Sequence, residues 1–332
     1  MRVSGCCRQE GLKEMSGWVY GVEIEGFLPG GFRSHLLQVE RAAGNRRPEL
    51  EVCFQVVEEV TRGEEFWVAE PCPPVSQSRF SLFRQENGFG LAVAAEGRGV
   101  FLITPEMIHI DWCADGAGAE HYFFSYALPL WLETVGVPVL HASVVAFGDR
   151  GVAFLGQSGA GKSTLCAELT KAGCSFVADD GLALRKGARG EWRCSHGPPL
   201  LRLWPSSLEP RLGVAANEFP RVHDTLEKRQ VALSSALPVT PGGLELVAVY
   251  VLDRKADSDG VVSISRSSPR QSLVRLIEHS VAGGPATALG LAGQRLDILA
   301  GIVEKVPLSV LSFPSSDDSA LRVREAVLRD LE

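Results

Sequence analysis

The most constraining feature of this chain is a glycine-rich stretch at residues 151–180, which reads GVAFLGQSGAGKSTLCAELTKAGCSFVADD. Its apolar run at 152–155 is typical of a buried parallel strand. Beyond the glycines, apolar residues recur at helical spacing as far as Gly173, which stands where a helix C-terminal cap belongs. A second short apolar run follows at 175–178. The stretch therefore predicts a strand, a tight loop, a helix and another strand, which is a building unit of an α/β domain.

The loop itself, GQSGAGKS at 156–163, matches the pattern G-x-x-x-x-G-K-[ST] at every fixed position. Glycines reach backbone dihedral angles that are closed to other residues, so consecutive N–H groups can turn inward around a phosphate while the following helix points its positive end at the same oxygens. The lysine and the hydroxyl that end the pattern serve the β- and γ-phosphates and Mg²⁺. Glycine-rich turns also occur without a ligand, but the flanking strand and helix favour a nucleotide site. We therefore expect ATP and Mg²⁺ as cofactors, held by Gly156, Gln157, Ser158, Gly159, Ala160, Gly161, Lys162, Ser163 and Thr164.

Two adjacent carboxylates, Asp179 and Asp180, follow the predicted strand at 175–178. Ligands of α/β sheets bind outside the carboxyl ends of the strands, so these side chains are expected beside the phosphate loop. One carboxylate can hold Mg²⁺, directly or through water, and the other can accept a proton from an attacking hydroxyl. The alternative is a solvated Asp-Asp turn before Gly181; the spacing from Lys162 favours the functional interpretation.

Further candidate site residues come from the flanking segments. His141 lies on a predicted strand at 137–147, immediately before the strand of the phosphate loop. Arg202, Lys228 and Arg229 occur in a polar, proline-bearing region. They are candidate phosphate clamps, because a transferring phosphoryl group needs extra positive charge in its transition state. The alternative for these three residues is a set of surface charges on loops.

The chain before this region is rich in short apolar or alternating runs separated by turn residues. The pattern predicts a β-rich meander or a small barrel and not a second phosphate-binding unit. The expected strands lie at 36–39, 50–57, 66–69, 80–83, 91–94, 100–104 and 107–110. Trp112, His35 and His109 fit packing or surface positions better than ligand positions.

The remaining segments complete a two-domain organisation. The apolar, aromatic segment 121–135 predicts a buried helical connector despite its proline. The later elements are expected to be a hairpin at 182–185 and 191–194, a strand at 244–252 with 261–265 as its neighbour, a helix from 269 to about 283 capped by Ser268, a second helix to Lys305, a strand at 308–313 and a terminal helix from 317. We therefore expect a β-rich N-terminal domain at 1–117 and an α/β (α+β) domain at 118–332.

Composition excludes several classes of protein. With 332 residues, of which 45% are hydrophobic and 22% charged, the chain is long enough for one large or two modest globular domains. A formal net charge of −7 with no block of basic residues argues against nucleic acid as the main partner. The 8 cysteines are scattered, without zinc-site spacing, as is typical of a reducing compartment. No apolar run approaches the length of a membrane span and the first residues lack the apolar core of a signal peptide, so we expect a cytoplasmic protein without a membrane partner.

The stretch LHASVVAFGDRGVAFLGQSGAGKST, followed by GCSFVADD, resembles the kinase domain of HPr kinase/phosphorylase. It is more similar to the HPr-kinase-related proteins of bacterial gene clusters for ribosomal peptides, including lasso-peptide kinases. The resemblance covers residues 139–183, with weaker likeness in LLRLWPSSL, EKRQV and the terminal helices. It implies a P-loop kinase domain with the fold of ATP-dependent phosphoenolpyruvate carboxykinase, phosphorylation of a serine hydroxyl on a peptide or small protein, and compatibility with a homo-oligomer.

By motif position, the resemblance implies roles for individual residues. His141 would lie near the transferred phosphate with Lys162, Asp179 would be the general base, and Asp180 would serve the metal with Ser163. Two departures set this chain apart from HPr kinases proper. Thr164 follows Ser163 where those enzymes have Glu, and their later signature for phosphorylase activity is not evident after Pro199. We therefore do not expect HPr as the substrate, or the reverse phosphorolysis.

Three functions follow from these patterns. The leading one is an ATP-dependent serine kinase acting on a peptide or small protein. A nucleotide-binding accessory protein without catalysis is the second, and retention of both carboxylates disfavours it because binding alone needs no base. A small-molecule kinase is the third. A nucleotide-dependent switch finds no support, since the chain lacks the guanine-reading N-K-x-D pattern.

Overall fold

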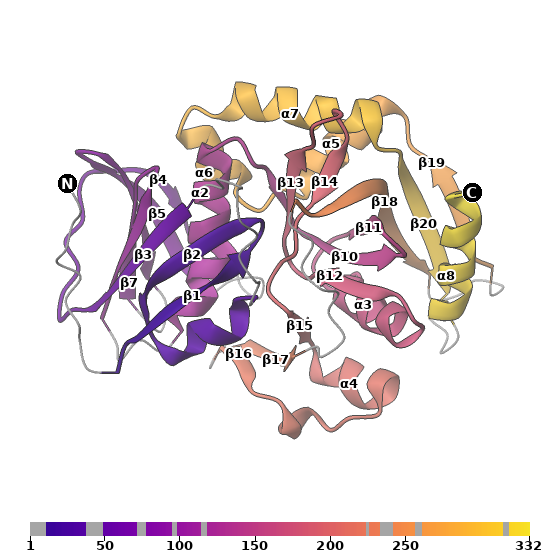
Figure 1. The fold of residues 1–332 in the computed structure, drawn as a ribbon, viewed down its shortest axis with the longest axis horizontal. Coiled ribbons are helices and arrows are strands. Elements are labelled where there is room, and N and C mark those ends of the chain that lie inside the picture. Colours follow the sequence, from indigo (N-terminus) through magenta and orange to yellow (C-terminus); the bar gives the residue numbers. More distant parts are fainter. Residues whose placement is uncertain are drawn as a thin grey trace. The chain divides into compact units, whose positions relative to one another are not determined.

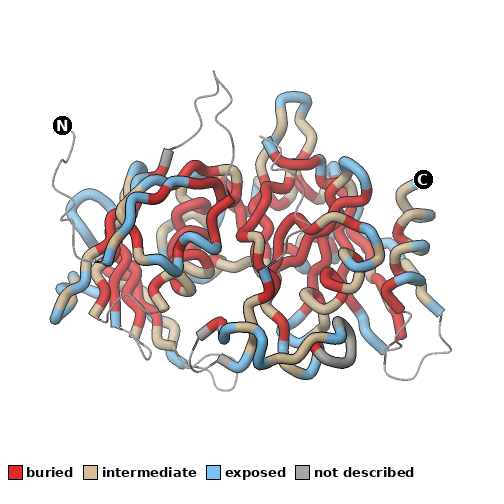
Figure 2. Tube along the Cα trace, turned by 60° about the horizontal axis from the view of Figure 1, so that its bottom comes forward, coloured by how far each residue is buried: buried red, intermediate tan, exposed pale blue. Residues whose placement is uncertain are grey.

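A computed structural model describes residues 11–37, 49–71, 78–94, 98–113, 118–223, 226–232, 242–255, 261–314 and 319–332. The chain is mixed α/β with several sheets, and it divides into two compact units (Figure 1). The N-terminal unit comprises Met1–Val135 and Ala282–Leu291, and the C-terminal unit comprises Gly136–Val281 and Ala292–Glu332. In each unit the buried segments are mainly strands, and the exposed ones lie in turns and on outer helix faces (Figure 2).

The N-terminal unit is built on one 8-stranded sheet with the order β1-β2-β3-β8-β7-β6-β5-β4. Its strands are β1 (Lys13–Val19), β2 (Val22–Leu28), β3 (Glu49–Val56), β4 (Glu65–Ala69), β5 (Arg79–Gln85), β6 (Gly88–Ala94), β7 (Arg98–Ile103) and β8 (Met107–Trp112). Strands β4 to β8 pair antiparallel in chain order, which confirms the predicted meander. Strand β3 pairs parallel with both β2 and β8, and among the described strands β1 and β4 are the two open edges of the sheet, so the barrel alternative is wrong.

The start of this unit differs from the prediction. The hairpin of β1 and β2 was missed because its alternation is broken by Tyr20 and Gly21, both of which have positive φ in the turn. A 3-10 helix, η1 (Gly30–His35), stands before the strand expected at 36–39. Leu37 forms one bridge with Trp18, and residues 38 and 39 lie outside the described part of the chain.

The aromatic segment after β8 forms a continuous buried helix, as predicted. It consists of α1 (Ala119–Tyr122), a π-helical turn η2 (Phe123–Ala127) and α2 (Leu128–Thr134). Phe123 packs against Phe32 at 5.4 Å and Phe101 at 6.4 Å between ring centroids, so the helix belongs to the core of the N-terminal unit. The chain therefore divides at Val135 and not at the expected residue 117.

His35, Trp112 and His109 were predicted to have packing or surface roles in this unit. His35 is 1% exposed and stacks on Phe124 at 4.6 Å, and Trp112 is fully buried. His109 pairs with Asp111 at 2.8 Å on the same strand. These contacts agree with the packing and surface roles predicted for them.

The C-terminal unit is built on a 9-stranded sheet whose path runs β12-β10-β11-β18-β14-β13-β9, with β20 beside β18 and β19 beside β20. Its strands are β9 (Val139–Leu140), β10 (Ala142–Phe147), β11 (Arg150–Leu155), β12 (Ser175–Ala178), β13 (Leu182–Lys186), β14 (Trp192–Cys194), β18 (Leu244–Lys255), β19 (Ser263–Arg266) and β20 (Leu308–Pro314). Strands β11, β18 and β20 run parallel, and the hairpin of β13 and β14 is confirmed. The strand at 261–265 was wrongly placed beside β18: the apolar β20 takes that position, and the more polar β19 pairs outside it.

Helices cover both faces of this sheet because the side chains of β11 alternate. Val152 and Phe154 pack with α3 (Lys162–Lys171) and α8 (Ser319–Asp330). Ala153 and Leu155 pack with α5 (Pro269–Glu278) and α7 (Ala292–Lys305). The phosphate-loop strand is thus buried on both faces, as its apolar run predicted.

The helices after β19 differ in part from the prediction. Ser268 caps α5 and forms a reciprocal capping box with Gln271, as expected. The second helix is divided, because Gly290 has a φ of 80° between α6 (Gly283–Ala288) and α7. Helix α6 joins the N-terminal unit, which no sequence pattern indicated.

A small 3-stranded sheet completes the C-terminal unit, with the order β15-β17-β16. Its strands are β15 (Leu200–Leu203), β16 (Arg221–His223) and β17 (Leu226–Ala232), accompanied by α4 (Pro205–Leu212) and the 3-10 helix η3 (Ala216–Glu218). No strand was predicted from the sequence in this region, which is polar and proline-bearing. Among the described helices, none has the length and apolar character needed to cross a membrane.

Candidate functional site

The phosphate loop connects β11 to α3 with the geometry that its glycines predict. Gly159 and Gly161 have φ values of 85° and 93°, which L-residues rarely adopt. A side chain at Gly156 would come within 2.9 Å of the Ala160 Cβ. The Ala160 N–H donates to the Gln157 carbonyl at 3.0 Å and closes the turn. The three glycines are therefore required by backbone conformation and close packing.

Lys162 is the first residue of α3 and is 5% exposed. Its Nζ donates to the carbonyls of Gly156 at 2.8 Å and Gln157 at 3.3 Å, so the side chain folds back over the loop. Burial lowers the pKa of Lys162, while the charges of Asp180 and Asp179 raise it. A buried ammonium whose hydrogen bonds, among the described residues, go to two carbonyl groups is well suited to meet an anion.

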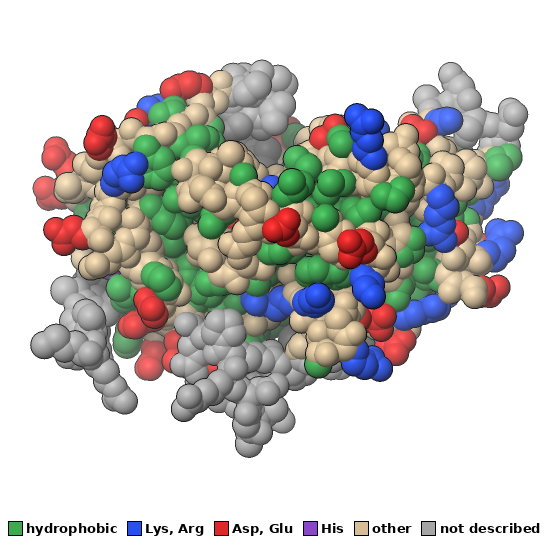
Figure 3. Space-filling view, turned by 90° about the horizontal axis from the view of Figure 1, so that it is seen from above, with side chains coloured by type: hydrophobic (Ala, Val, Ile, Leu, Met, Phe, Trp, Pro, Cys, Tyr) green, Lys and Arg blue, Asp and Glu red, His purple; other side chains and the backbone are tan. Residues whose placement is uncertain are grey.

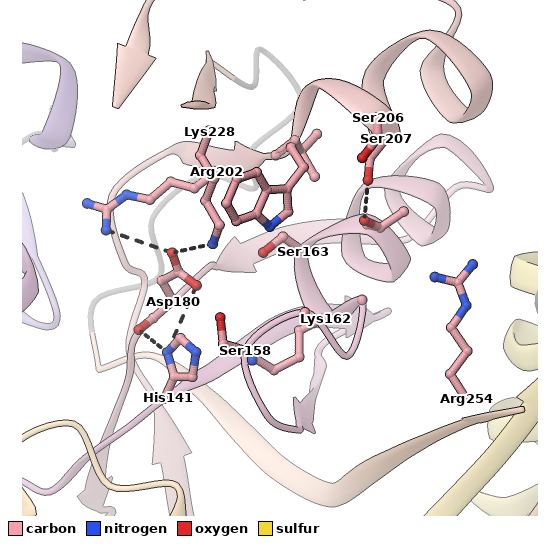
Figure 4. Close-up of a pocket in the computed structure, with 15 residues that line it drawn as sticks. His141, Ser158, Lys162, Ser163, Asp180, Arg202, Ser206, Ser207, Lys228 and Arg254 are labelled. Atoms are coloured by element: carbon pink, nitrogen blue, oxygen red, sulfur yellow. Dashed lines mark hydrogen bonds and ion pairs between the residues drawn. The ribbon is translucent and has the colours of Figure 1, made fainter. Parts of the chain in front are cut away.

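A polar cavity of about 230 Å³ opens at this loop (Figure 4). Four cationic side chains and one carboxylate line it, together with an imidazole, hydroxyls and an indole. The lining residues are His141, Ser158, Gly159, Gly161, Lys162, Ser163, Thr164, Asp180, Arg202, Leu203, Trp204, Ser206, Ser207, Lys228 and Arg254. This excess of positive charge suits a polyanionic ligand.

Asp180 is the carboxylate that faces the cavity. Its oxygens lie 3.8 Å from Arg202 Nη1, 3.9 Å from Lys228 Nζ and 3.9 Å from His141 Nδ1 (Figure 4). Burial alone would raise the pKa of Asp180, but the charges of Lys228, His141 and Arg202 outweigh it and hold the pKa below its usual range. A φ of 59° at this residue turns its side chain away from the direction that a continued strand would give.

Asp179 does not line the cavity. It is buried at the end of β12, where its Oδ1 accepts a hydrogen bond from Ser143 Oγ at 2.5 Å and its Oδ2 accepts one from the Arg202 backbone N–H at 3.0 Å. Burial and the nearby charge of Asp180 raise the pKa of Asp179. Both oxygens are engaged inside the protein, so the expected role of Asp179 as the base does not fit this geometry, whereas Asp180 faces the cavity where a metal-side residue is expected.

His141 lies between β9 and β10 and borders the cavity, as predicted. Its backbone N–H donates to the His279 carbonyl at 2.6 Å, which fixes the segment. Its Nδ1 is 3.4 Å from the Asp180 carbonyl oxygen. Burial lowers the pKa of His141 and Lys162 adds to this effect, while Asp180 opposes it.

The first turn of α3 contributes two hydroxyl groups. Ser163 and Thr164 both line the cavity. Thr164 Oγ1 donates to Ser207 Oγ at 3.2 Å, which ties α3 to α4. The Ser163 hydroxyl makes no such bridge within the described part of the chain and is the better placed of the two to serve a metal.

The predicted phosphate clamps come from the small sheet. Arg202 on β15 and Lys228 on β17 line the cavity, where their side chains are 11% and 18% exposed. They are therefore held on strands, and the alternative of surface loop charges is wrong for these two. Arg229 does not line the cavity: it follows Lys228 on the same strand, points to the opposite face and donates to the Phe219 carbonyl at 3.3 Å.

The predicted site residues did not include five of the lining residues, namely Leu203, Trp204, Ser206, Ser207 and Arg254. Arg254 lies near the carboxyl end of β18, which runs parallel to β11, and its Nη1 would be 3.3 Å from a Cβ at Gly161. The rule that ligands bind beyond the carboxyl ends of parallel strands could have found it. Trp204 is 41% exposed, with Lys228 Nζ 5.9 Å from its ring centroid; it lies in the segment LLRLWPSSL, whose weak likeness gave it no role.

The residues present fit a magnesium nucleotide. Among the described residues no group of three or more His, Cys, Asp or Glu side chains could hold a metal ion. Mg²⁺ in nucleotide sites is commonly bound by one or two protein oxygens together with phosphates, and Ser163 and Asp180 offer such oxygens here. The four cations would balance the phosphate charge.

Comparison with known proteins gives little. No family model and no curated protein matches this chain. The solved structures that match include the HPr(Ser) kinase/phosphatase from Coxiella burnetii, with 13% sequence identity over 58% of this chain and 99% of that chain, and a TM-score of 0.32. A likeness at this level transfers neither an activity nor residue roles.

Proposed function

We propose that this chain is an ATP-dependent phosphotransferase that moves the γ-phosphate of ATP to a serine hydroxyl on a peptide or small protein. The cavity at the phosphate loop is the observation that carries the proposal, because it brings Lys162, Ser163, Asp180 and three further cations together. The proposed reaction requires ATP and Mg²⁺, and its setting is the cytoplasm.

In this proposal the loop and α3 bind the phosphates. Backbone N–H groups of the glycine-rich loop and Lys162 contact the β- and γ-phosphate oxygens, in the place where Lys162 now donates to carbonyls. The Ser163 hydroxyl holds Mg²⁺, which when bound neutralises part of the phosphate charge. Arg254 adds positive charge beside Gly161.

Asp180 acts at the acceptor end of the cavity. It accepts the proton of the attacking hydroxyl, while Arg202 and Lys228 stabilise the charge that develops on the transferring group. The charges of Lys228 and Arg202 hold the pKa of Asp180 below its usual range. When phosphates share the same cations, the carboxylate loses part of that stabilisation, and its pKa rises toward the range of a useful base.

Asp180 also favours catalysis over simple binding. A carboxylate among the phosphate-binding cations repels an anionic ligand, so a protein that only binds nucleotide would be better served by a neutral residue there. Trp204, exposed beside Lys228, offers the acceptor an apolar surface next to the reacting groups. The choice of a peptide over a small molecule rests on the sequence resemblance.

Transfer of labelled phosphate tests the proposal. The full-length protein, incubated with γ-labelled ATP and Mg²⁺, should label serine-containing peptides, and peptides with every serine replaced by alanine should stay unlabelled. Label on small hydroxyl compounds alone would move the assignment to a small-molecule kinase. Binding of Mg·ATP without any transfer would favour the accessory-protein function.

A further inference from the structure

Asp179 joins three elements of the C-terminal unit. Its carboxylate stands at the end of β12, accepts from Ser143 Oγ on β10 at 2.5 Å, and accepts from the Arg202 backbone N–H on β15 at 3.0 Å. Strands β10 and β12 belong to the large sheet, and β15 belongs to the small one. This carboxylate is therefore a direct link between the two sheets.

Asp179 accepts a hydrogen bond from the backbone of Arg202, and the side chain of Arg202 lines the cavity. Arg202 Nη1 lies 3.8 Å from Asp180, and the next two residues, Leu203 and Trp204, also line the cavity. A shift of the Arg202 amide would move all three lining residues against the phosphate loop. The placement of this side of the cavity thus depends on a hydrogen bond formed behind it.

Ser143, the partner of Asp179 on β10, is a polar residue on an otherwise apolar, buried strand. All six residues of β10 are buried, and Ser143 is fully buried as the strand's hydroxyl residue. A buried ion is costly unless its oxygens are hydrogen-bonded, and here each carboxylate oxygen has one donor. The hydrogen bonds of the Asp179 carboxylate are thus made within the protein, to Ser143 and to the Arg202 backbone. We take the second of these bonds to hold Arg202 in place.

We propose that Asp179 is a positioning residue, which fixes Arg202 and the small sheet against the phosphate loop without taking part in proton transfer. The proposal rests on the proposed function in one respect, because it assumes that Arg202 contacts the bound nucleotide. It departs from the sequence-based expectation that Asp179 is the base.

An amide can replace a positioning carboxylate at this place but cannot replace a base. In Asp179→Asn, the side-chain oxygen can accept from the Arg202 N–H while the NH₂ group donates to Ser143 Oγ. In Asp179→Ala, both donors lose their partner. The asparagine variant should therefore rescue what the alanine variant loses.

Titration of Mg·AMP-PNP, a non-hydrolysable ATP analogue, into full-length variants tests the link. We expect Asp179→Ala and Arg202→Ala each to weaken binding about ten-fold, the scale of one lost hydrogen bond or charge contact. The double variant should bind no more than a few-fold more weakly than Arg202→Ala, because residues that act through each other are not additive. Asp179→Asn should bind within about three-fold of the wild type. Additive losses, or an asparagine variant as weak as the alanine variant, would overturn the proposal.

A matched control separates positioning from general stability. Asp330 accepts from Tyr250 Oη at 2.7 Å in the same unit and does not line the cavity. Asp330→Ala should lower the melting temperature and leave Mg·AMP-PNP affinity unchanged. A loss of affinity in this variant equal to that of Asp179→Ala would mean that the effect of Asp179 is merely one of stability, which contradicts the proposal.

Hydrogen–deuterium exchange, measured without nucleotide, tests the hydrogen bond between Asp179 and the Arg202 amide directly. The Arg202 amide should exchange slowly in the wild type and in Asp179→Asn, and faster in Asp179→Ala. Equal exchange in all three proteins would contradict the link. A wild type that fails to bind Mg·AMP-PNP would count against the proposed function alone, since this exchange result stands independently.

Discussion

At the scale of the residue, the account depends on which charged groups meet in the cavity. Lys162 and Asp180 both line it, whereas Asp179, the immediate neighbour of Asp180, is enclosed by Ser143 and Arg202. The sequence could place both carboxylates at the end of β12, because they directly follow its apolar run, and ligands of α/β sheets bind outside such strand ends. It could not say which one turns inward, since that is decided by the φ of 59° at Asp180.

Lys162→Ala should abolish phosphoryl transfer while the fold stays intact. The ammonium donates to the loop carbonyls of Gly156 and Gln157 and is proposed to meet the phosphates. Circular dichroism and a transfer assay check both halves. The control is Lys171→Ala at the other end of α3, an exposed lysine that should have no effect; near-normal transfer by Lys162→Ala would contradict the phosphate-loop assignment.

At the scale of the element, strands and helices were predicted correctly where the sequence carries a local signal. The hairpin of β13 and β14, the buried β11 and the cap of α5 were all indicated by alternation, an apolar run or a capping sequence. The position of β20 between β18 and β19 was not, because parallel neighbours far apart in sequence leave no local signal. The small sheet was missed because β15 and β16 are short, and prolines lie in the segment between them.

The cap of α5 predicts a stability effect. Ser268 Oγ accepts from the Gln271 N–H at 3.3 Å, so Ser268→Ala should destabilise the protein by about 1 kcal/mol. Ser265→Ala on β19, an exposed serine, is the control and should change stability by less than about 0.5 kcal/mol. Denaturant titration followed by fluorescence measures both, and equal effects would remove the cap from the account.

The pair of β4 and β5 predicts an acid-dependent contribution to stability. Hydrogen bonds from Arg79 and Ser81 lower the pKa of Glu65 from 4.5 to about 2. Because the folded pKa lies below the unfolded one, this contribution is complete above about pH 4.5 and is lost as the pH falls toward 2. Glu65→Gln should lower the melting temperature at pH 7 and reduce its dependence on pH in that window. Glu59→Gln is the control and should leave the melting temperature and its pH dependence unchanged. If the melting temperature of Glu65→Gln depended on pH as that of the wild type does, the assigned role of Glu65 would be contradicted.

At the scale of the whole molecule, the cavity belongs to one unit. Every lining residue lies between His141 and Arg254, within the C-terminal unit. The expected boundary at residue 117 would have divided the buried helix from its own core, and the return of α6 to the N-terminal unit could not be foreseen from its short, glycine-bearing sequence. On the face drawn in Figure 3, apolar side chains lie exposed among scattered charged ones. The exposed apolar residues of the C-terminal unit include Val274, Ile277 and Leu296.

A truncated chain tests this division. Removal of residues 1–135, with 282–291 replaced by a short glycine-serine linker, should leave a folded protein that binds Mg·ATP, because all lining residues are retained. Calorimetry measures binding and circular dichroism confirms folding. A folded truncation that no longer binds Mg·ATP would show that the N-terminal unit contributes to the nucleotide site.

The central claim is that Asp180, and not Asp179, is the carboxylate that acts in phosphoryl transfer. The most direct measurement compares the rate of γ-phosphate transfer to a serine peptide in Asp180→Asn and Asp179→Asn, both at saturating Mg·ATP. We expect Asp180→Asn to lose about 10²-fold or more in turnover, the usual scale of acid–base catalysis, and Asp179→Asn to stay within about five-fold of the wild type. The reverse order of the two losses would contradict the account.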